Sequence, residues 1–286
     1  MIKRVLHLLL ALILMPISAY AGWQVTVTPE HLQDALELSV SELNLTDASK
    51  ADVFVADATS KVKQTLQAFG YYDPEVSIQT HHKTHTLVVN AGPPVRLRVI
   101  NIQVVGAAER DERFKPPAFP QATGDVLQHS QYESFKQQLE ERALERGYFD
   151  SRWLVSSIEV NLQERVADVY LGFDSGERYQ FGPISYREVD GKPLRALNAL
   201  QLARLTPFKT GDAISSRQLF QLQKNLIETR YFREAQVSFR RDQTLNRQVP
   251  VEVVVDSRFY SVFSQYRAMY FYRGQIELFY YIHIVY

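Results

Sequence analysis

The sequence lacks cysteine, lacks an excess of either charge, and has no apolar run of the ~20 residues that a membrane-spanning helix needs. Without cysteine, disulfide frameworks, thiol catalysis and cysteine-ligated zinc are all excluded. The 32 Lys and Arg residues balance the 32 Asp and Glu residues, which argues against a nucleic-acid binder. What the 286 residues do have is a hydrophobic fraction of 45%, which is typical of a folded protein.

The first 21 residues have the pattern of a secretory signal peptide. Lys3 and Arg4 give a positive start, residues 5–15 are apolar almost throughout, and Ala19-Tyr20-Ala21 has the small-x-small pattern of a cleavage site. The apolar run is about half of the ~20 residues that a membrane anchor would need, so a cleaved signal is favoured over an anchor. We therefore expect export from the cytoplasm and a mature chain that starts at Gly22.

Two sequence motifs recur along the rest of the chain, and such repeats reveal architecture before any single motif does. Gly70-Tyr71-Tyr72-Asp73 returns as Gly147-Tyr148-Phe149-Asp150 and, altered, as Arg230-Tyr231-Phe232-Arg233. Pro120-x-x-Thr123-Gly124-Asp125 returns as Pro207-x-x-Thr210-Gly211-Asp212. Because both motifs recur in the same order, we infer three copies of one unit.

The residues before each glycine-tyrosine motif predict a helix. Leu66, Ala143 and Leu226 each lie four residues before the motif, and further apolar residues lie four residues earlier on the same helix face. Gly70 and Gly147 suit a left-handed helix stop, a conformation that a residue with a Cβ adopts less easily. The aromatic residues that follow are interpreted as core residues rather than as a ligand-binding cluster.

Asp125 and Asp212 each follow a glycine upstream of such a helix. We interpret them as caps at the start of the region that leads into the helix. Downstream, alternating apolar residues predict a hairpin in each copy. Each copy also opens with a strand, predicted at 23–27, 97–105 and 179–186. Amphipathic stretches follow at 30–43 and 193–205, with a less regular stretch near 109–114.

We therefore predict an α+β fold of three tandem β-α-α-β-β modules, each a three-stranded sheet with two helices. The predicted boundaries are 1–21 for the signal peptide, 22–92, 93–175 and 176–257 for the modules, and 258–286 for an aromatic-rich tail.

This organisation resembles POTRA domains. The motifs that carry the resemblance are Gly147-Tyr148-Phe149-Asp150, the two Pro-x-x-Thr-Gly-Asp motifs and Tyr179-x-Phe181-Gly182-x-Ile184. Three such modules behind a signal peptide resemble the arm of TamA-like outer-membrane assembly factors of the BamA/TamA superfamily. The resemblance covers residues 1 to about 258.

The resemblance implies a role in outer-membrane protein and autotransporter assembly and translocation, at the periplasmic face of the cell outer membrane. It implies a TamB-like periplasm-spanning partner and unfolded outer-membrane protein or autotransporter clients. Two alternatives remain open: a freestanding periplasmic protein-binding module, or another transporter of the superfamily, of the two-partner secretion or BamA type.

Members of this superfamily continue into a membrane barrel. The tail of residues 258–286 contains eleven Phe and Tyr residues but has room for two or three spanning strands at most, at ~9–11 residues each. We interpret it as the start of a barrel that is truncated or disrupted in frame.

No motif in the sequence supports an enzyme. His81-His82-x-x-His85 is interpreted as a polar hairpin tip rather than a metal site. The paired carboxylates Asp111-Glu112 and Glu140-Glu141 are interpreted as solvated surface. Phosphate-binding glycine loops and nucleophile-elbow motifs do not occur. We therefore expect no catalysis, no cofactor and no bound metal.

The remaining chemistry is that of the peptide backbone. A three-stranded sheet leaves open edges whose N–H and C=O groups can pair with an incoming strand. If the sheet order of the family holds, the first strand of each hairpin is an open edge, and in the first module this strand starts at residue 75. The expected partner-binding residues are Glu75, Val76, Ser77, Ile78 and Gln79. The alternative is that these edges are covered.

The first module also differs from the others in charge. Residues 22–92 contain nine Asp and Glu residues and four Lys residues, a net charge of −5. Because charge can steer an encounter, we predict that this module is the end that docks the partner. The alternative is that the charge only keeps the module soluble.

Overall fold

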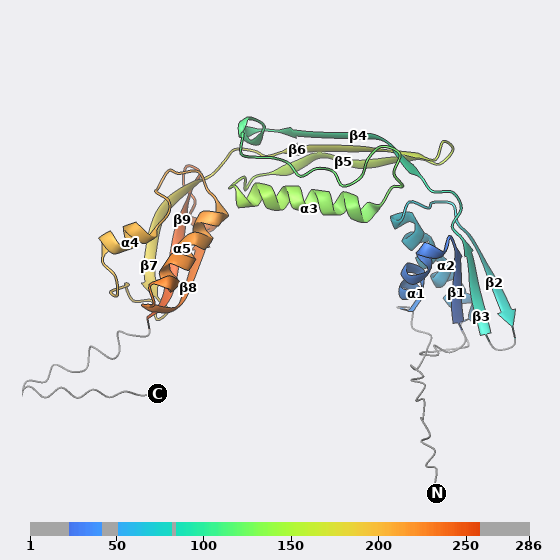
Figure 1. Cartoon of the computed structure of the whole chain (residues 1–286), viewed down its shortest axis with the longest axis horizontal. Helices are drawn as coiled ribbons and strands as arrows, with labels where there is room; N and C mark the ends of the chain where they lie inside the picture. The colour runs from blue at the N-terminus through green and yellow to red at the C-terminus, as the bar shows by residue number, and fades with distance from the viewer. Residues whose placement is uncertain (1–22, 42–50, 82–83, 258–286) are drawn as a thin grey trace, which may run out of the picture. The chain divides into compact units, whose positions relative to one another are not determined.

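The computed structural model describes residues 23–41, 51–81 and 84–257, and the predicted signal peptide and tail lie outside these ranges. Within them the fold is α+β, with three three-stranded sheets and five α-helices (Figure 1). The strand orders are β1-β3-β2, β4-β6-β5 and β7-β9-β8, so the last strand of each copy occupies the centre of its sheet. The predicted fold class is confirmed, and we call each sheet with its helices the first, second and third module.

The first module is built around β3. Its elements are β1 (Trp23–Thr28), η1 (Glu30–Leu32), α1 (Gln33–Ser41), α2 (Ala51–Ala68), β2 (Glu75–His81) and β3 (Thr84–Asn90). β3 pairs in parallel with β1 and antiparallel with β2. The helices bury Leu36, Val62 and Leu66 in a cluster that includes Leu87 and Val89 of β3. The spacing of four along α2 thus places both of its residues in one core.

The second module departs from the prediction of two helices. Its elements are β4 (Arg96–Val105), η3 (Ala107–Arg110), α3 (His129–Glu145), β5 (Arg152–Asn161) and β6 (Val166–Asp174). A single 3-10 turn, η3, stands where the first helix was expected. Pro116, Pro117 and Pro120 follow soon after, and proline cannot continue a helix because it lacks a backbone N–H and clashes with the preceding turn.

The third module repeats the order of the first. Its elements are β7 (Gln180–Glu188), α4 (Ala199–Leu205), α5 (Ser216–Glu228), β8 (Phe232–Phe239), η4 (Arg241–Gln243) and β9 (Gln248–Ser257). β9 pairs in parallel with β7 and antiparallel with β8. Its alternate residues Val251, Val253 and Val255 are buried in one cluster with Leu222 and Leu226 of α5.

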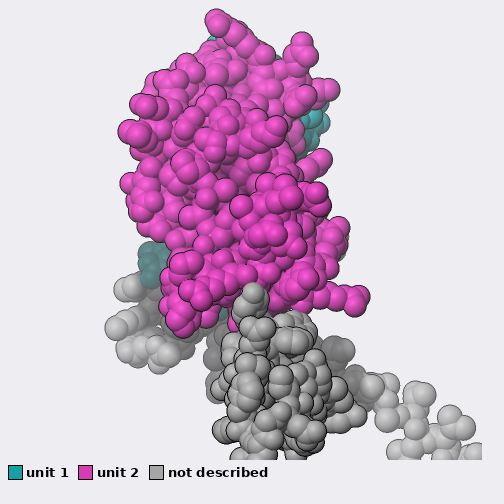
Figure 2. Space-filling model, turned by 90° about the vertical axis from the view of Figure 1, so that its left-hand side faces the viewer, with its two compact units in different colours: residues 1–103, 117–137, 155–171 teal, residues 104–116, 138–154, 172–286 magenta. Residues whose placement is uncertain are grey.

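The chain divides into two compact units (Figure 2). Unit 1 comprises residues 1–103, 117–137 and 155–171, and unit 2 comprises residues 104–116, 138–154 and 172–286. The first sheet lies in unit 1 and the third sheet lies in unit 2, whereas the strands of the second sheet contribute to both. Within the ranges that the structure describes, no helix combines the length and the apolar character needed to cross a membrane.

The helix stops behave as the sequence predicted. Gly147 follows α3 with φ +83°, and Gly70 follows α2 with φ +86°. Arg230 takes the same left-handed conformation, with φ +62°, although its Cβ makes that cost roughly 1–2 kcal/mol. The core aromatics are confirmed in two copies, where Tyr71 and Tyr148 are buried. In the third copy Tyr231 is exposed and the next residue, Phe232, is buried instead, since β8 begins there.

Candidate partner-binding edge and module joints

The five expected partner-binding residues all lie in β2, at the edge of the first sheet. β2 pairs with β3 from Glu75 opposite Asn90 to His81 opposite Thr84. Among the described residues no strand pairs with its other side, since the order is β1-β3-β2. The expectation that the first strand of the hairpin is an edge strand is therefore correct for this sheet.

The two faces of β2 differ in chemistry. Val76 and Ile78 stand opposite Val89 and Leu87, which are buried, so both side chains lie on the core face of the sheet. Ile78 is nevertheless 36% exposed, because no further strand of the described ranges flanks it. The alternate residues Glu75, Ser77 and Gln79 are exposed. A strand added to this edge would meet apolar side chains on one face and polar side chains on the other.

The histidine cluster lies at the tip of the same hairpin. His81 ends β2 and His85 lies in β3, while His82 lies outside the described residues. Among the residues that are described, no group of three or more His, Cys, Asp or Glu side chains is placed to hold a metal ion.

The first joint connects the first and second modules within unit 1. The Val95 N–H donates to the Gly70 carbonyl at 2.8 Å, and the Leu127 N–H donates to the Val95 carbonyl at 3.0 Å. Tyr72 Oη and His129 Nε2 share a hydrogen bond of 2.6 Å beside these backbone contacts. These hydrogen bonds connect the helix stop of the first module to the start of the first strand of the second module and to the loop before α3.

The second joint repeats this backbone pattern within unit 2. The Tyr179 N–H donates to the Gly147 carbonyl at 2.8 Å, and the Ile214 N–H donates to the Tyr179 carbonyl at 3.1 Å. The Tyr179 hydroxyl also donates to Asp150 Oδ2 at 2.8 Å. Phe149, beside the helix stop, packs against the core of the third module. The glycine-tyrosine motif therefore ends a helix and also provides the contact to the next module.

The Pro-x-x-Thr-Gly-Asp motifs form the loops that these joints use. Asp125 accepts the Ala122 N–H at 2.7 Å, and Asp212 accepts the Lys209 N–H at 2.8 Å. The predicted capping role is therefore wrong: each aspartate closes its own turn, and α5 has Ser215 as its N-cap residue. Because the bond runs backwards along the chain, the carboxylate stabilises the loop before the helix rather than the helix end.

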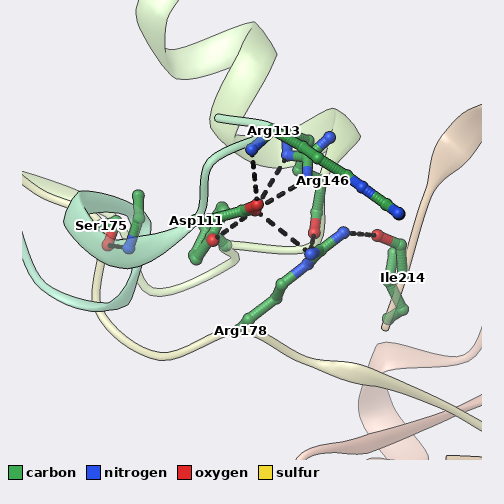
Figure 3. A network of polar contacts seen from close by, with 8 residues as sticks. Asp111, Arg113, Arg146, Ser175, Arg178 and Ile214 are labelled. Atoms are coloured by element: carbon green, nitrogen blue, oxygen red, sulfur yellow. Dashed lines mark hydrogen bonds and ion pairs between the residues drawn. The ribbon is translucent and has the colours of Figure 1, made fainter. Parts of the chain in front are cut away.

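Asp111 anchors a polar network at the second joint (Figure 3). Its Oδ2 accepts hydrogen bonds from Arg146 at 2.7 Å, from the Tyr148 hydroxyl at 2.9 Å and from Arg178 at 3.2 Å. The Arg113 N–H donates to its other oxygen at 3.0 Å. The side chain is only 13% exposed, so the interpretation of Asp111 as solvated surface is wrong.

Arg178 links the second module to the third through this network. Its Nε donates to the Arg146 carbonyl at 2.8 Å, while one terminal nitrogen reaches Asp111 and the other donates to the Ile214 carbonyl at 3.0 Å. Figure 3 shows the guanidinium between Asp111 and Ile214. All three guanidinium nitrogens therefore donate to an acceptor, and the planar group fixes the directions of these hydrogen bonds relative to one another.

The ionisation of this network follows from its surroundings. Burial raises the pKa of Asp111, but the hydrogen bonds from Arg146 and Tyr148 outweigh burial and leave the pKa below its ordinary value. Burial, assisted by the hydrogen bond to Asp111, raises the pKa of Tyr148 to about 12. At the first joint burial lowers the pKa of His129, with an opposing effect from Glu133. The second joint is therefore charged and the first joint neutral at pH 7.

Sequence reasoning missed this network, because Asp111 and Arg178 are 67 residues apart and follow no local period. One signal was available. In the alignment of copies that pairs Val95 with Tyr179, Arg178 takes the position of Pro94. A residue with five N–H donors replaces one with none, which marks that position as different.

Comparison with known proteins supports the sequence resemblance. Residues 23–92 match the family described as POTRA domain TamA domain 1. POTRA domains 3–5 of BamA from Haemophilus influenzae align over 83% of this chain and 95% of that chain, at 14% identity and a TM-score of 0.43. POTRA domains 1–3 of the periplasmic domain of Omp85 from Anabaena align over 84% and 96%, at 17% identity and a TM-score of 0.31.

CdiB from Acinetobacter baumannii aligns over 75% of this chain and 40% of that chain, at 14% identity and a TM-score of 0.28. At such TM-scores these three structures carry no argument, so the assignment rests on the family match. The match supports the resemblance to POTRA domains: residues 23–92 are similar to the TamA domain 1 family, and two further modules with the same strand order follow them.

Proposed function

We propose that this chain is the periplasmic POTRA arm of a TamA-like outer-membrane assembly and translocation factor, and that it binds rather than catalyses. The observation that carries the proposal is β2, an edge strand that pairs only with β3 among the described residues, in the module that matches the TamA domain 1 family. Backbone N–H and C=O groups recognise any strand, and this tolerance of sequence suits a factor that handles many clients.

The recognition step is the addition of a strand to β2, over Glu75–Gln79. The partner is a TamB-like periplasm-spanning protein, and the clients are unfolded outer-membrane or autotransporter polypeptides. Backbone hydrogen bonds supply the affinity, while the apolar face at Val76 and Ile78 favours a strand with apolar side chains on the matching face. The net charge of −5 over residues 22–92 would raise the rate of encounter with a basic partner more than the affinity.

Proline substitutions at two neighbouring positions test this step. Successive residues of a strand direct their N–H groups to opposite sides, so Ser77→Pro and Ile78→Pro remove one N–H that faces β3 and one that faces outward. The variant that loses the outward N–H should keep its thermal stability and lose the TamB-like partner in a pull-down. Ser77→Ala and Ile78→Val, which retain both donors and the apolar face of β2, are the matched controls and should keep the partner.

Partner binding by both proline variants, each shown to be folded by circular dichroism, would contradict strand addition at β2. If a deletion of residues 22–92 still retains the partner, docking does not use the first module at all. Retention by the proline variants together with loss on deletion would mean that the first module docks through another surface.

A further inference from the structure

A second candidate binding surface lies on α5, in the third module and far along the sequence from β2. Leu219, Leu222 and Leu226 are buried on the side of α5 that faces the sheet. The opposite side also carries large apolar residues, since Phe220 is 68% exposed and Ile227 is 39% exposed. These two residues lie seven positions apart, which aligns them along the helix after two turns.

The exposed apolar residues continue past the end of the helix. α5 ends at Glu228, and Tyr231, three residues later, is 47% exposed. We call Phe220, Ile227 and Tyr231 the α5 stripe. Single apolar residues scattered over a surface are normal, whereas several that lie together mark an interaction surface. The α5 stripe is therefore a candidate contact surface of the third module.

The α5 stripe is bordered by positive charge. Arg217 and Lys224 lie seven residues apart on the exposed side of the helix, and Arg230 follows its end. Among the residues that the structure describes, Arg217 and Arg230 form no ion pair. Lys224 pairs with Glu228 at 3.7 Å, but both side chains are more than half exposed, so this pair is weak. Residues 216–231 contain three cations and one anion, a net charge of +2.

Helix α4 carries the same combination of exposed apolar and basic residues. The Asn225 side chain of α5 donates to the Leu205 carbonyl at the end of α4, at 2.7 Å, and Figure 1 shows both helices beside the third sheet. Leu202 and Leu205 pack against the core, whereas Leu200 is 64% exposed. Arg204, four residues after Leu200 and on the same side of the helix, is exposed as well.

The α5 stripe ends beside the point where the chain leaves the described residues. Phe232, which follows Tyr231, pairs with Ser257, the last residue of β9. Residues 258–286 therefore continue from the end of the third module that carries Tyr231. Under the proposed function this tail is the start of the membrane-inserted part, and the inference rests on that function. The tail is a poor cover for the stripe, because its three arginines and one glutamate repeat the positive charge of α5.

We propose that the α5 stripe lies on the surface of a bilayer that contains anionic lipids. Phe220 and Ile227 enter the region between headgroups and acyl chains, while Arg217 and Lys224 contact lipid phosphates. Exposed apolar residues flanked by Lys and Arg are the combination with which helices bind in the plane of a membrane surface. Anionic headgroups attract each basic residue near the surface, and this attraction adds to the burial of the apolar side chains.

Fluorescence quenching on vesicles tests this placement with the full chain. Because the chain has no cysteine, Phe220→Cys, Ile227→Cys and Gln236→Cys each carry a single environment-sensitive label. Gln236 is exposed and follows the buried Ala235 in β8, so it lies on the sheet face that the helices do not cover. On vesicles of phosphatidylcholine and phosphatidylglycerol that contain brominated lipid, the first two labels should be quenched and the third should not.

Removal of two charges tests the basic border. Arg217→Gln/Lys224→Gln should lower the affinity for the mixed vesicles roughly thirtyfold in co-sedimentation, at about fivefold for each basic residue near the surface. The matched control is Arg110→Gln/Arg247→Gln, which removes the same charge from unit 2 outside α5. Arg247 has an exposed ion pair, as Lys224 has, and Arg110 has no ion pair among the described residues. The control should keep most of the affinity.

Three results would overturn the inference. Equal quenching of all three labels, or of none, would mean that α5 has no preferred contact with the bilayer. Equal affinities of the two double variants would mean that the vesicles respond to net charge alone. Concentration-dependent self-association in sedimentation velocity that is lost in Phe220→Ser/Ile227→Ser would mean that a second copy of this chain covers the stripe.

The same variants separate this inference from the proposed function. They leave β2 unchanged, so they should retain the TamB-like partner in a pull-down. Absence of quenching together with retention of the partner rejects the membrane contact alone. Retention of the partner by both folded proline variants of β2 rejects the proposed strand addition, whatever the labels on α5 report.

Discussion

The two joints have the same pattern of backbone hydrogen bonds and differ in the side chains that surround it. In each, the N–H of the residue that opens the next module donates to the carbonyl of a left-handed glycine, and its carbonyl accepts from the loop before the next helix. The first joint adds the hydrogen bond between Tyr72 and His129, whereas the second adds the ionic network of Asp111, Arg146 and Arg178. The repeat thus sets the geometry of a joint, and non-repeated residues set its strength.

This contrast predicts that substitutions of polar side chains affect the stability of the two joints differently. Pro94 offers no donors where Arg178 connects two modules, so the first joint depends on few polar contacts. The second joint contains partly buried charges that must stay paired, because an unpaired buried charge is costly.

The largest effect is expected at the glycine of the second joint. In Gly147→Ala the new methyl would lie 2.6 Å from Ile214 Cβ, and φ of +83° is unfavourable for any residue with a Cβ. We expect a loss of about 3 kcal/mol, the sum of left-handed strain and overpacking. Gly211→Ala is the matched control, since its φ is +91° and nothing lies within 4 Å of the added methyl, so only about 1 kcal/mol of strain applies.

Urea denaturation followed by tryptophan fluorescence measures this difference. Trp153 packs edge to face on Phe173, with centroids 5.0 Å apart, and reports on unit 2, which contains both glycines, when Trp23 is replaced by phenylalanine. Equal losses for the alanine variants of Gly147 and Gly211 would show that no close approach exists at the joint.

A smaller effect is expected from Asp111→Asn. The variant keeps the size of the side chain but leaves Arg146 and Arg178 without a counter-charge, so the free energy of unfolding should fall by about 1–3 kcal/mol. Asp190→Asn removes an exposed ion pair with Lys192 and should change stability little. Similar denaturation midpoints for the two variants would contradict a structural role for the network.

The sequence predicts the shared features of the joints better than the features that distinguish them. Gly70 and Gly147 were identified as left-handed helix stops because a repeated motif reports a repeated backbone conformation. The position of β2 at a sheet edge followed from the sheet order that the resemblance to POTRA domains implies, and the structure has that order. By contrast, the capping role predicted for Asp125 is wrong, because a carboxylate beside a turn can accept a hydrogen bond from a residue on either side of it along the chain, and Asp125 accepts from Ala122.

Asp111 was misinterpreted for another reason. Its neighbours in sequence are charged, and only the folded chain brings it beside Arg146 and Arg178. The second module likewise has a 3-10 turn where a first helix is predicted. The repeat alignment predicts that helix without taking account of the proline-containing segment that follows. The partner of β2 follows from no local pattern, so the binding role of Glu75–Gln79 stays a proposal.

The smallest effect is a difference in acid sensitivity. The lowered pKa of His129 means that its contribution to the first joint is complete above pH ~6.5 and is lost as the pH falls through the folded value. The pKa of Asp111 lies below its ordinary ~3.9, so the second joint should keep its contribution until the pH falls below about 4. The first joint should therefore weaken at milder acidity.

Hydrogen exchange at two equivalent amides resolves this difference. The N–H groups of Val95 and Tyr179 donate to the carbonyls of Gly70 and Gly147, respectively. After correction for intrinsic exchange, protection at Val95 should fall as the pH drops below ~6.5, while protection at Tyr179 is maintained down to about pH 4. The step at Val95 should disappear in His129→Gln, and simultaneous loss at both amides would contradict the assignment.

The central claim, strand addition at β2, is tested most directly by site-specific cross-linking. Because the chain has no cysteine, Ser77→Cys, Ile78→Cys and Gln79→Cys each provide a single reactive position along the open edge. If a partner strand adds there, Ser77→Cys and Gln79→Cys should cross-link to partner residues two apart, and Ile78→Cys to the residue between them. Cross-links without this alternation, or equal yields from Lys63→Cys on helix α2, would contradict the account.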